Sequence, residues 1–295
     1  MLVSFYPTWA DPTSSWWAKV NRAGEHVQSL REQVAAFRDS DPYSLTAEPT
    51  DVPDQLAYRL KFLRPVPISI STTVGDILSN LRAALECLAY EVARRTQGGQ
   101  LTPEQERLSS FPIRSTPEEF DKFFKGRVGA LYDERARQAL RHAQPFFFDE
   151  QAVQYGIALS DTYEERAQWH PMIRLDRLWN IDKHRRLTIM AWWPDMIYWG
   201  SNGPSNRQML PGDGTVADGA ILFRMQGRDE GMGDGVNHEF NLAITDDPGF
   251  RPGEGASDDV VELLSRWHQH LVTAVFPQVF TVMSTPVPEQ NPGTA

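Results

Sequence analysis

The chain has 295 residues, of which 41% are hydrophobic and 23% are charged, and its formal net charge is −10 at pH 7. This composition is typical of a soluble globular protein, and its acidity argues against one that coats nucleic acid through a general basic surface. A single cysteine, Cys87, excludes an intramolecular disulfide and argues against a thiolate metal centre. No apolar run approaches the roughly 20 residues of a membrane span and no secretory signal is evident, so we expect a cytoplasmic protein that does not enter the membrane.

Two long helices and one strand are predicted in the first hundred residues. An apolar stripe predicts a helix over 16–38, and a Pro- and Asp-rich connector continues through Pro53. Alternating apolar residues predict a strand over 56–63. A long central helix is predicted over 73–96, because it begins with a capping-box pattern and ends just before Gly98.

Shorter elements are expected in the middle of the chain: an extended segment at 111–114, helices over 117–125 and 132–143, and a segment over 146–161 that is helical or irregular. Another helix begins at Pro171, because proline suits the first helical position. Beyond it, Pro194-Asp195 predicts a hairpin turn flanked by Trp192, Trp193 and Trp199. We expect these aromatic side chains to cover the helical core, with stacking on a base or a partner chain as the alternative.

The predicted fold is a single α+β domain over 1–284. Strands over 219–226 and 236–245 and a helix over 258–280 complete its elements, and a Pro-rich, disordered tail over 285–295 follows. The helical core is formed by about 14–187 and 257–281, around the long central helix. A small antiparallel β-meander over about 187–246 packs beside that core.

The chemically densest part of the sequence lies at 175–187, in the predicted helix that begins at Pro171. At about 100° per residue, Arg177, Asn180 and His184 share one face of this helix. Asp182 falls on the opposite, apolar face beside leucine and tryptophan residues. The two faces are therefore expected to have different roles.

Asp182 needs a partner on the apolar face, because an isolated buried carboxylate is costly. The central helix supplies the candidates Asn80, Arg82 and Glu86. Arg82 could form a bidentate pair with Asp182, and Glu86 could pair with Arg185 or Arg186. We expect these residues to form a structural ion-pair network that ties the two helices together.

Arg177, Asn180 and His184 could instead carry chemistry. A histidine can move a proton near neutral pH, and an arginine can hold a phosphate bidentately. In metal-independent cleavage of a phosphodiester, His184 would be the general acid or base, Arg177 would stabilise charge on the phosphorane and Asn180 would orient the phosphate. Residues 174–186 carry five basic and two acidic side chains, a local excess of three positive charges that could position a phosphate. The alternative is a solvated polar face with a surface histidine.

The arginine and histidine of this face also resemble a known motif. Arg177, six intervening residues and His184 on a late helix are similar to the R-x(4–6)-H motif of HEPN-type ribonucleases, although Leu178 stands where that family has a polar residue. The resemblance implies a homodimer that brings two motifs together and cleaves RNA without a metal or another cofactor. It also implies a role as a toxin or a phage-defence effector.

A second resemblance covers the middle third of the chain. Residues 75–90, 111–113 and 180–187 look like a large group of bacterial proteins that has no established activity. This resemblance implies a shared fold and a shared polar cluster, without implying a reaction. The alternative to a ribonuclease is therefore a non-catalytic binding, structural or phage-accessory protein whose Arg/His/Asp cluster connects helices. His268 and His270, two apart on a helix, should diverge, and we expect no metal site.

Overall fold

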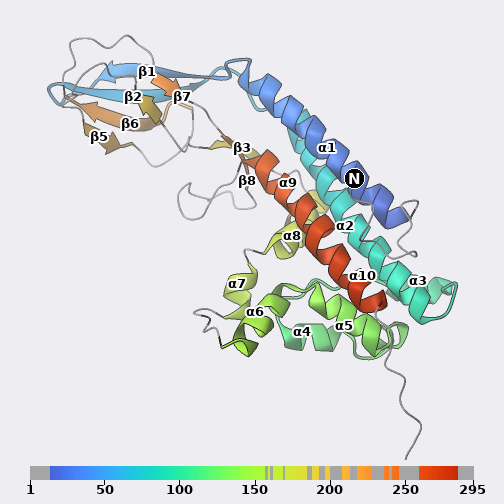
Figure 1. The fold of residues 1–295 in the computed structure, drawn as a ribbon. Coiled ribbons are helices and arrows are strands. Elements are labelled where there is room, and N and C mark those ends of the chain that lie inside the picture. Colours follow the sequence, from blue (N-terminus) through green and yellow to red (C-terminus); the bar gives the residue numbers. More distant parts are fainter. Residues whose placement is uncertain are drawn as a thin grey trace, which may run out of the picture. The chain divides into compact units, whose positions relative to one another are not determined.

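The computed structural model of the protein describes residues 14–156, 159, 162–168, 170–184, 188–192, 197–199, 208–212, 218–227, 236–238, 241–245 and 259–284. These residues form an α+β fold, as predicted (Figure 1). The chain divides into two compact units, which are described separately. Unit 1 comprises Met1–Glu25, Asp76–Asn180 and Ser265–Ala295, and unit 2 comprises His26–Gly75 and Ile181–Leu264.

Unit 1 consists of helices. Its shorter helices are α3 (Pro103–Leu108), α4 (Pro117–Phe123), α5 (Glu134–His142), α6 (Pro145–Gln154) and α7 (Tyr163–Ala167), with a 3-10 turn at Gly129–Leu131. Side chains of Thr102, Thr116 and Asp133 cap the first turns of α3, α4 and α5, which explains why these helices begin where they do. The helices predicted over 117–125 and 132–143 are confirmed, and the ambiguous segment after them contains α6.

Four longer helices, α1 (Ser15–Arg38), α2 (Ile68–Thr96), α8 (Pro171–His184) and α9 (Val260–His270), contribute residues to both units. The end of α2 is the predicted one. Gly98 has a φ of +73°, and the amides of Gly98 and Gly99 donate to the carbonyls of Arg95 and Arg94 at 3.1 and 3.0 Å. These two bonds form a Schellman cap, which needs a residue that tolerates positive φ.

The predicted start of α2 is wrong. The helix begins at Ile68, five residues before Thr73, so the capping-box pattern lies inside the helix. The Thr73 hydroxyl instead accepts a hydrogen bond from the Gln33 amide at 2.9 Å. A capping-box pattern marks the start of a helix only where the residues before it are not helical. Here the helix extends further toward the N-terminus, and its residues Ile70 and Val74 are buried.

The C-terminal helix of unit 1 changes its geometry along its length. A five-residue π-helix, Leu271–Val275, separates α9 from α10 (Phe276–Ser284). Pro277 explains this irregularity, because it has no N–H to donate to the carbonyl of Thr273. Phe276 and Phe280 of α10 lie against the buried Trp16 ring, with centroids 5.1 and 5.0 Å away. α10 lies beside α5 (Figure 1), and Arg135 Nε donates to the Val282 carbonyl at 2.9 Å.

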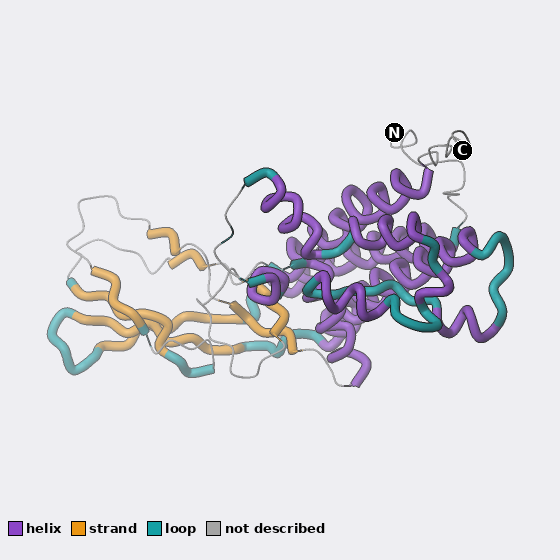
Figure 2. The backbone as a smooth tube through the Cα atoms, turned by 90° about the horizontal axis from the view of Figure 1, so that it is seen from below, coloured by secondary structure: helices purple, strands orange, loops and turns teal. Residues whose placement is uncertain are grey.

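Unit 2 contains a four-stranded antiparallel sheet in the order β1-β2-β6-β5, whose strands are orange in Figure 2. The strands are β1 (Tyr43–Pro49), β2 (Gln55–Phe62), β5 (Gln208–Pro211) and β6 (Ile221–Gln226). Leu60, Leu222 and Met225 form its core together with the stacked rings of Tyr58 and Phe223, whose centroids are 4.6 Å apart. Part of the predicted connector through Pro53 is therefore strand β1, and the sheet includes strands that precede α2.

Two strands of the Trp-rich segment pair with later parts of the chain. β3 (Thr188–Trp192) pairs with β8 (Asn241–Thr245), and β4 (Ile197–Trp199) pairs with β7 (Val236–His238), both antiparallel. These strands therefore belong to antiparallel pairs, as expected of the small β-meander. The turn at Pro194-Asp195, Trp193, the side chains of Trp192 and Trp199, and the tail over 285–295 lie outside the described residues.

Candidate functional site

Helix α8 has the two faces that its sequence predicts. Met172, Leu175 and Leu178 are buried, whereas Arg177, Asn180 and His184 are exposed. The helix begins at Pro171, where a missing N–H costs no hydrogen bond. The prediction of an apolar face and a polar face is confirmed, while Arg185, Arg186 and Leu187 lie outside the described residues.

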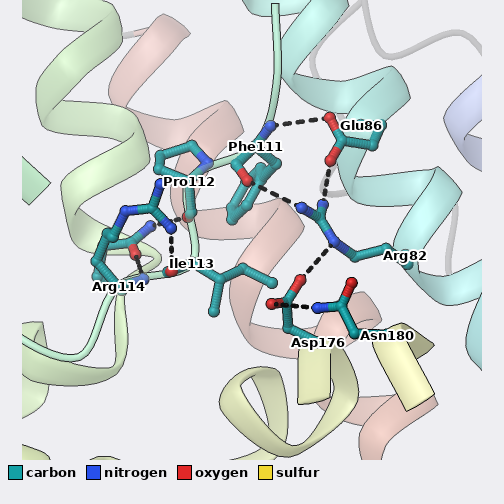
Figure 3. A network of polar contacts seen from close by, with 9 residues as sticks. Arg82, Glu86, Phe111, Pro112, Ile113, Arg114, Asp176 and Asn180 are labelled. Atoms are coloured by element: carbon teal, nitrogen blue, oxygen red, sulfur yellow. Dashed lines mark hydrogen bonds and ion pairs between the residues drawn. The ribbon is translucent and has the colours of Figure 1, made fainter. Parts of the chain in front are cut away.

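A buried arginine joins α8 to α2 within unit 1 (Figure 3). The Arg82 side chain is 9% exposed, and its Nε donates to Asp176 Oδ1 of α8 at 2.9 Å. Its Nη1 forms an ion pair with the Glu86 carboxylate, one turn along α2. The guanidinium also lies over the Trp179 ring, 5.1 Å from its centroid. We call Arg82, Glu86 and Asp176 the Arg82 cluster.

The acid that meets Arg82 is thus Asp176 and not the predicted Asp182. These two acids are six positions apart, so they point about 120° away from each other around the helix. Asp182 instead lies against Gly75 of α2, where an added Cβ would be 2.7 Å from a carboxylate oxygen. Asn80 was also predicted in the network, but its amide donates to the Asp76 carbonyl of its own helix at 2.8 Å.

The Arg82 cluster holds the extended segment 111–114 by its backbone. Glu86 Oε2 accepts from the Phe111 N–H at 3.0 Å, and Arg82 Nη2 donates to the Phe111 carbonyl at 3.4 Å. Figure 3 shows both contacts on the same residue. The two side chains therefore satisfy one donor and one acceptor that a neighbouring strand would satisfy in a sheet.

Gln144 repeats this arrangement at the other end of the segment. Its side chain is fully buried, its Nε2 donates to the Pro112 carbonyl at 2.8 Å and its Oε1 accepts from the Arg114 N–H at 3.0 Å. Nε2 also donates to the Leu140 carbonyl at 2.9 Å. Gln144 was not predicted as a site residue, because only its position before the helix-starting Pro145 distinguishes it in the sequence. The segment 111–114, predicted to be extended, belongs to no helix or strand, and these side chains hold its backbone.

The exposed face of α8 is connected to the buried cluster through one residue. Asn180 Nδ2 donates to Asp176 Oδ2 at 3.2 Å, while Asp176 Oδ1 accepts from Arg82. One oxygen of the Asp176 carboxylate thus binds the buried Arg82, and the other binds the exposed Asn180 (Figure 3). A side-chain amide carries two N–H donors and a carbonyl oxygen, so this bond orients Asn180 while leaving it further bonding capacity.

Three histidines of unit 1 lie apart from this face. Burial and the neighbouring His270 lower the pKa of His170 to about 3, and the two rings meet edge to face with centroids 5.2 Å apart. Burial also lowers the pKa values of His268 and His270. His268 Nε2 lies 3.1 Å from the Val20 carbonyl, so the prediction that His268 and His270 diverge is confirmed.

Comparisons with known proteins add no family. No protein-family model matches the sequence, and neither a curated protein nor a solved structure matches it. Among the described residues, no group of three or more histidine, cysteine or acidic side chains is placed to hold a metal ion. In the same part of the chain, no helix is both long and apolar enough to cross a membrane.

Proposed function

We propose that the protein is a metal-independent endoribonuclease of HEPN-like type and that its catalytic face is the exposed side of α8. One observation carries this proposal: Asn180, on that exposed side, is fixed by Asp176, which the buried Arg82 holds in turn. A catalytic group works best on a rigid element whose supporting residues lock its orientation. Arg177 and His184 are exposed on the same side of this helix.

The helix spacing suits a phosphodiester substrate. Arg177 and His184 are seven residues apart, which corresponds to a rise of about 10.5 Å and a rotation of about 20°. One strand of RNA lying along α8 could therefore meet both side chains. Arg177 would neutralise charge on the reacting phosphate, Asn180 would orient it and the basic residues Arg174 and Lys183 would add to the local positive field.

The reaction balances without a metal. His184 removes the proton from a ribose 2′-hydroxyl, whose oxygen attacks the adjacent phosphorus, and the bond from phosphorus to the 5′-oxygen breaks. An imidazolium donates a proton to the leaving 5′-oxygen, and in a homodimer a second copy of His184 would supply it. The products are a 2′,3′-cyclic phosphate and a free 5′-hydroxyl. A role as a toxin or defence effector would follow from such an activity on cellular or phage RNA.

The test is RNA cleavage in the presence of EDTA. The wild-type protein should cleave a mixed RNA and leave cyclic phosphate ends, and His184→Ala and Arg177→Ala should each lower the rate at least about 100-fold. Lys122→Ala is the control, because it removes an exposed charge of α4, outside the proposed catalytic face. Cleavage that persists in His184→Ala would show a contaminating nuclease and would reject the proposal. A strictly monomeric solution mass would reject the paired-histidine step.

A non-catalytic role is the second candidate, and a specific observation favours it. The Arg82 cluster and Gln144 use their polar atoms to hold the backbone of 111–114, which is a structural task. In that case α8 would carry only a solvated polar face. A folded wild-type protein that leaves RNA intact at every tested concentration would support this candidate over the ribonuclease.

A further inference from the structure

Unit 1 contains an open cavity of about 430 Å³ at the C-terminal end of α2. The side chains of Arg94 and Arg95 line it together with Arg135 and Asp133 from the start of α5 and Met283 from α10. The volume falls within the range of about 300–1,000 Å³ that is typical of small-molecule sites. Its lining comes from α2, α5, α10 and the loop after α2, so it does not depend on any chemistry at α8.

The end of α2 explains why two arginines meet there. The Schellman cap reverses the chain at Gly98, and the amides of Gly98 and Gly99 satisfy the carbonyls of Arg95 and Arg94. The carbonyls of Arg94 and Arg95 are therefore already bonded, and because a helix C-terminus favours cations, the arginine side chains have to supply the attraction for an anion. The side chains of the same two arginines line the cavity.

The guanidinium groups of Arg94 and Arg135 are each held in place at one edge. Arg94 donates from Nε and Nη2 to the carboxylate of Glu91, at 2.9 and 2.6 Å. Arg135 donates from Nε to the Val282 carbonyl at 2.9 Å. A guanidinium has five N–H donors, so each arginine keeps donors after these bonds. Because the groups are already fixed, a ligand would lose little free energy in ordering them.

The charge of the cavity is opposite to that of the whole chain. Three arginines and one acid line it, although the chain carries a formal net charge of −10. The acid, Asp133, is engaged as the N-cap of α5, where its Oδ1 accepts from the Ala136 N–H at 2.8 Å. Three forked donors, two from α2 and one from α5, suit a tetrahedral group with oxygens in several directions better than a planar carboxylate.

We propose that this cavity binds a small molecule through a phosphate group, with pyrophosphate or a nucleoside phosphate as the size that fits. The phosphate lies among Arg94, Arg95 and Arg135, and Arg94 and Arg135 contribute donors that their bonds to Glu91 and Val282 leave available. The rest of the volume accepts the remainder of the ligand beside Met283. The interaction is electrostatic and directional, so it weakens as salt increases.

Calorimetric titration of the full chain with orthophosphate, pyrophosphate and AMP, at about 0.15 M salt, tests the proposal. At least one of them should bind saturably with a dissociation constant below about 1 mM, and Arg95→Gln and Arg135→Gln should each weaken binding about tenfold. Arg127→Gln is the control, because Arg127 is 79% exposed and paired with Glu104 outside the cavity lining. That variant should bind within about twofold of the wild type.

The variants Arg95→Gln and Arg135→Gln differ in how strongly they could disturb folding, so at least one of them should report on binding alone. Arg135 is bonded to α10 and could be needed for folding, whereas Arg95 is exposed on the last turn of α2. Thermal unfolding of each variant identifies a folding defect. The proposal is wrong if none of the three phosphates binds saturably, if Arg127→Gln weakens binding as much as Arg95→Gln, or if malonate competes as well as pyrophosphate.

Discussion

The Arg82 cluster and the Arg-lined cavity both gather arginines in unit 1, but they use them in opposite ways. Arg82 divides its donors among two carboxylates and a backbone carbonyl, so internal acceptors occupy it. Arg94 and Arg135 each meet one internal group and line an open volume. Arg82, which meets internal acceptors on several sides, fixes packing, whereas Arg94 and Arg135, each held at one edge, keep donors that a ligand could use.

The largest effect is expected when Arg82 is removed. Arg82→Met should lower the free energy of unfolding by about 3 kcal/mol, because it leaves Glu86 and Asp176 without their cation and the Phe111 carbonyl without its donor. Those acids are 33% and 32% exposed, so solvent reduces the loss below that of a fully buried pair. Urea unfolding measures it. Arg22→Met removes an exposed pair with Glu25 and should cost less than about 1 kcal/mol. Equal losses would show that the Arg82 cluster is not structural.

Gln144 tests whether the segment 111–114 depends on its side-chain contacts. Gln144→Leu should lower the free energy of unfolding by about 2 kcal/mol, because it leaves the Pro112 carbonyl and the Arg114 N–H without partners in a buried place. Hydrogen exchange at Arg114 should accelerate in the same variant. Gln28→Leu is the control, because the Gln28 amide bonds only to exposed side chains of its own helix. A loss no larger than that of the control would mean that 111–114 is held by packing alone.

His170 should make the free energy of unfolding depend on pH. Its pKa is lowered to about 3 in the folded protein, whereas an unfolded histidine has a pKa of about 6.5. The unfolded chain therefore binds the proton first, so the stabilising contribution is complete above pH 6.5 and is lost as the pH falls toward 3. Between pH 7 and pH 5, the free energy of unfolding should fall by about 1–2 kcal/mol through this residue.

A matched substitution isolates that titration. His170 Nδ1 accepts from the Met172 N–H at the start of α8, and the oxygen of an asparagine can accept the same bond. His170→Asn should therefore keep the helix cap while flattening the pH dependence of urea unfolding. An unchanged slope between pH 5 and pH 7 would assign the acid sensitivity to other groups.

The sequence predicted what depends on local periodicity. The buried stripe of α2, the Schellman end at Gly98 and the two faces of α8 follow from spacing along one helix. The choice between Asp176 and Asp182 depends on how α8 is rotated against its neighbours, which spacing does not define. Strand β1 was missed because it is a mostly exposed edge strand whose short alternation of Tyr43, Leu45 and Ala47 with polar residues lies within a Pro- and Asp-rich stretch. The cavity was missed because Arg94 and Arg135 are far apart in the sequence.

The smallest predicted effect, that of a substitution at Gly75, tests whether Asp182 lies on Gly75 and leaves Asp176 to the Arg82 cluster. Replacing a helical glycine by alanine normally stabilises a helix by about 1 kcal/mol. At Gly75 the new Cβ would lie 2.7 Å from the Asp182 carboxylate, so Gly75→Ala should lose that gain and leave the free energy of unfolding unchanged or lower. In an Asp182→Ser background the smaller side chain makes room, and the same change should be stabilising by up to about 1 kcal/mol. If Gly75→Ala stabilises the wild type by that amount, Asp182 does not pack on Gly75, and Asp176 could no longer be taken as the one acid of α8 that meets Arg82.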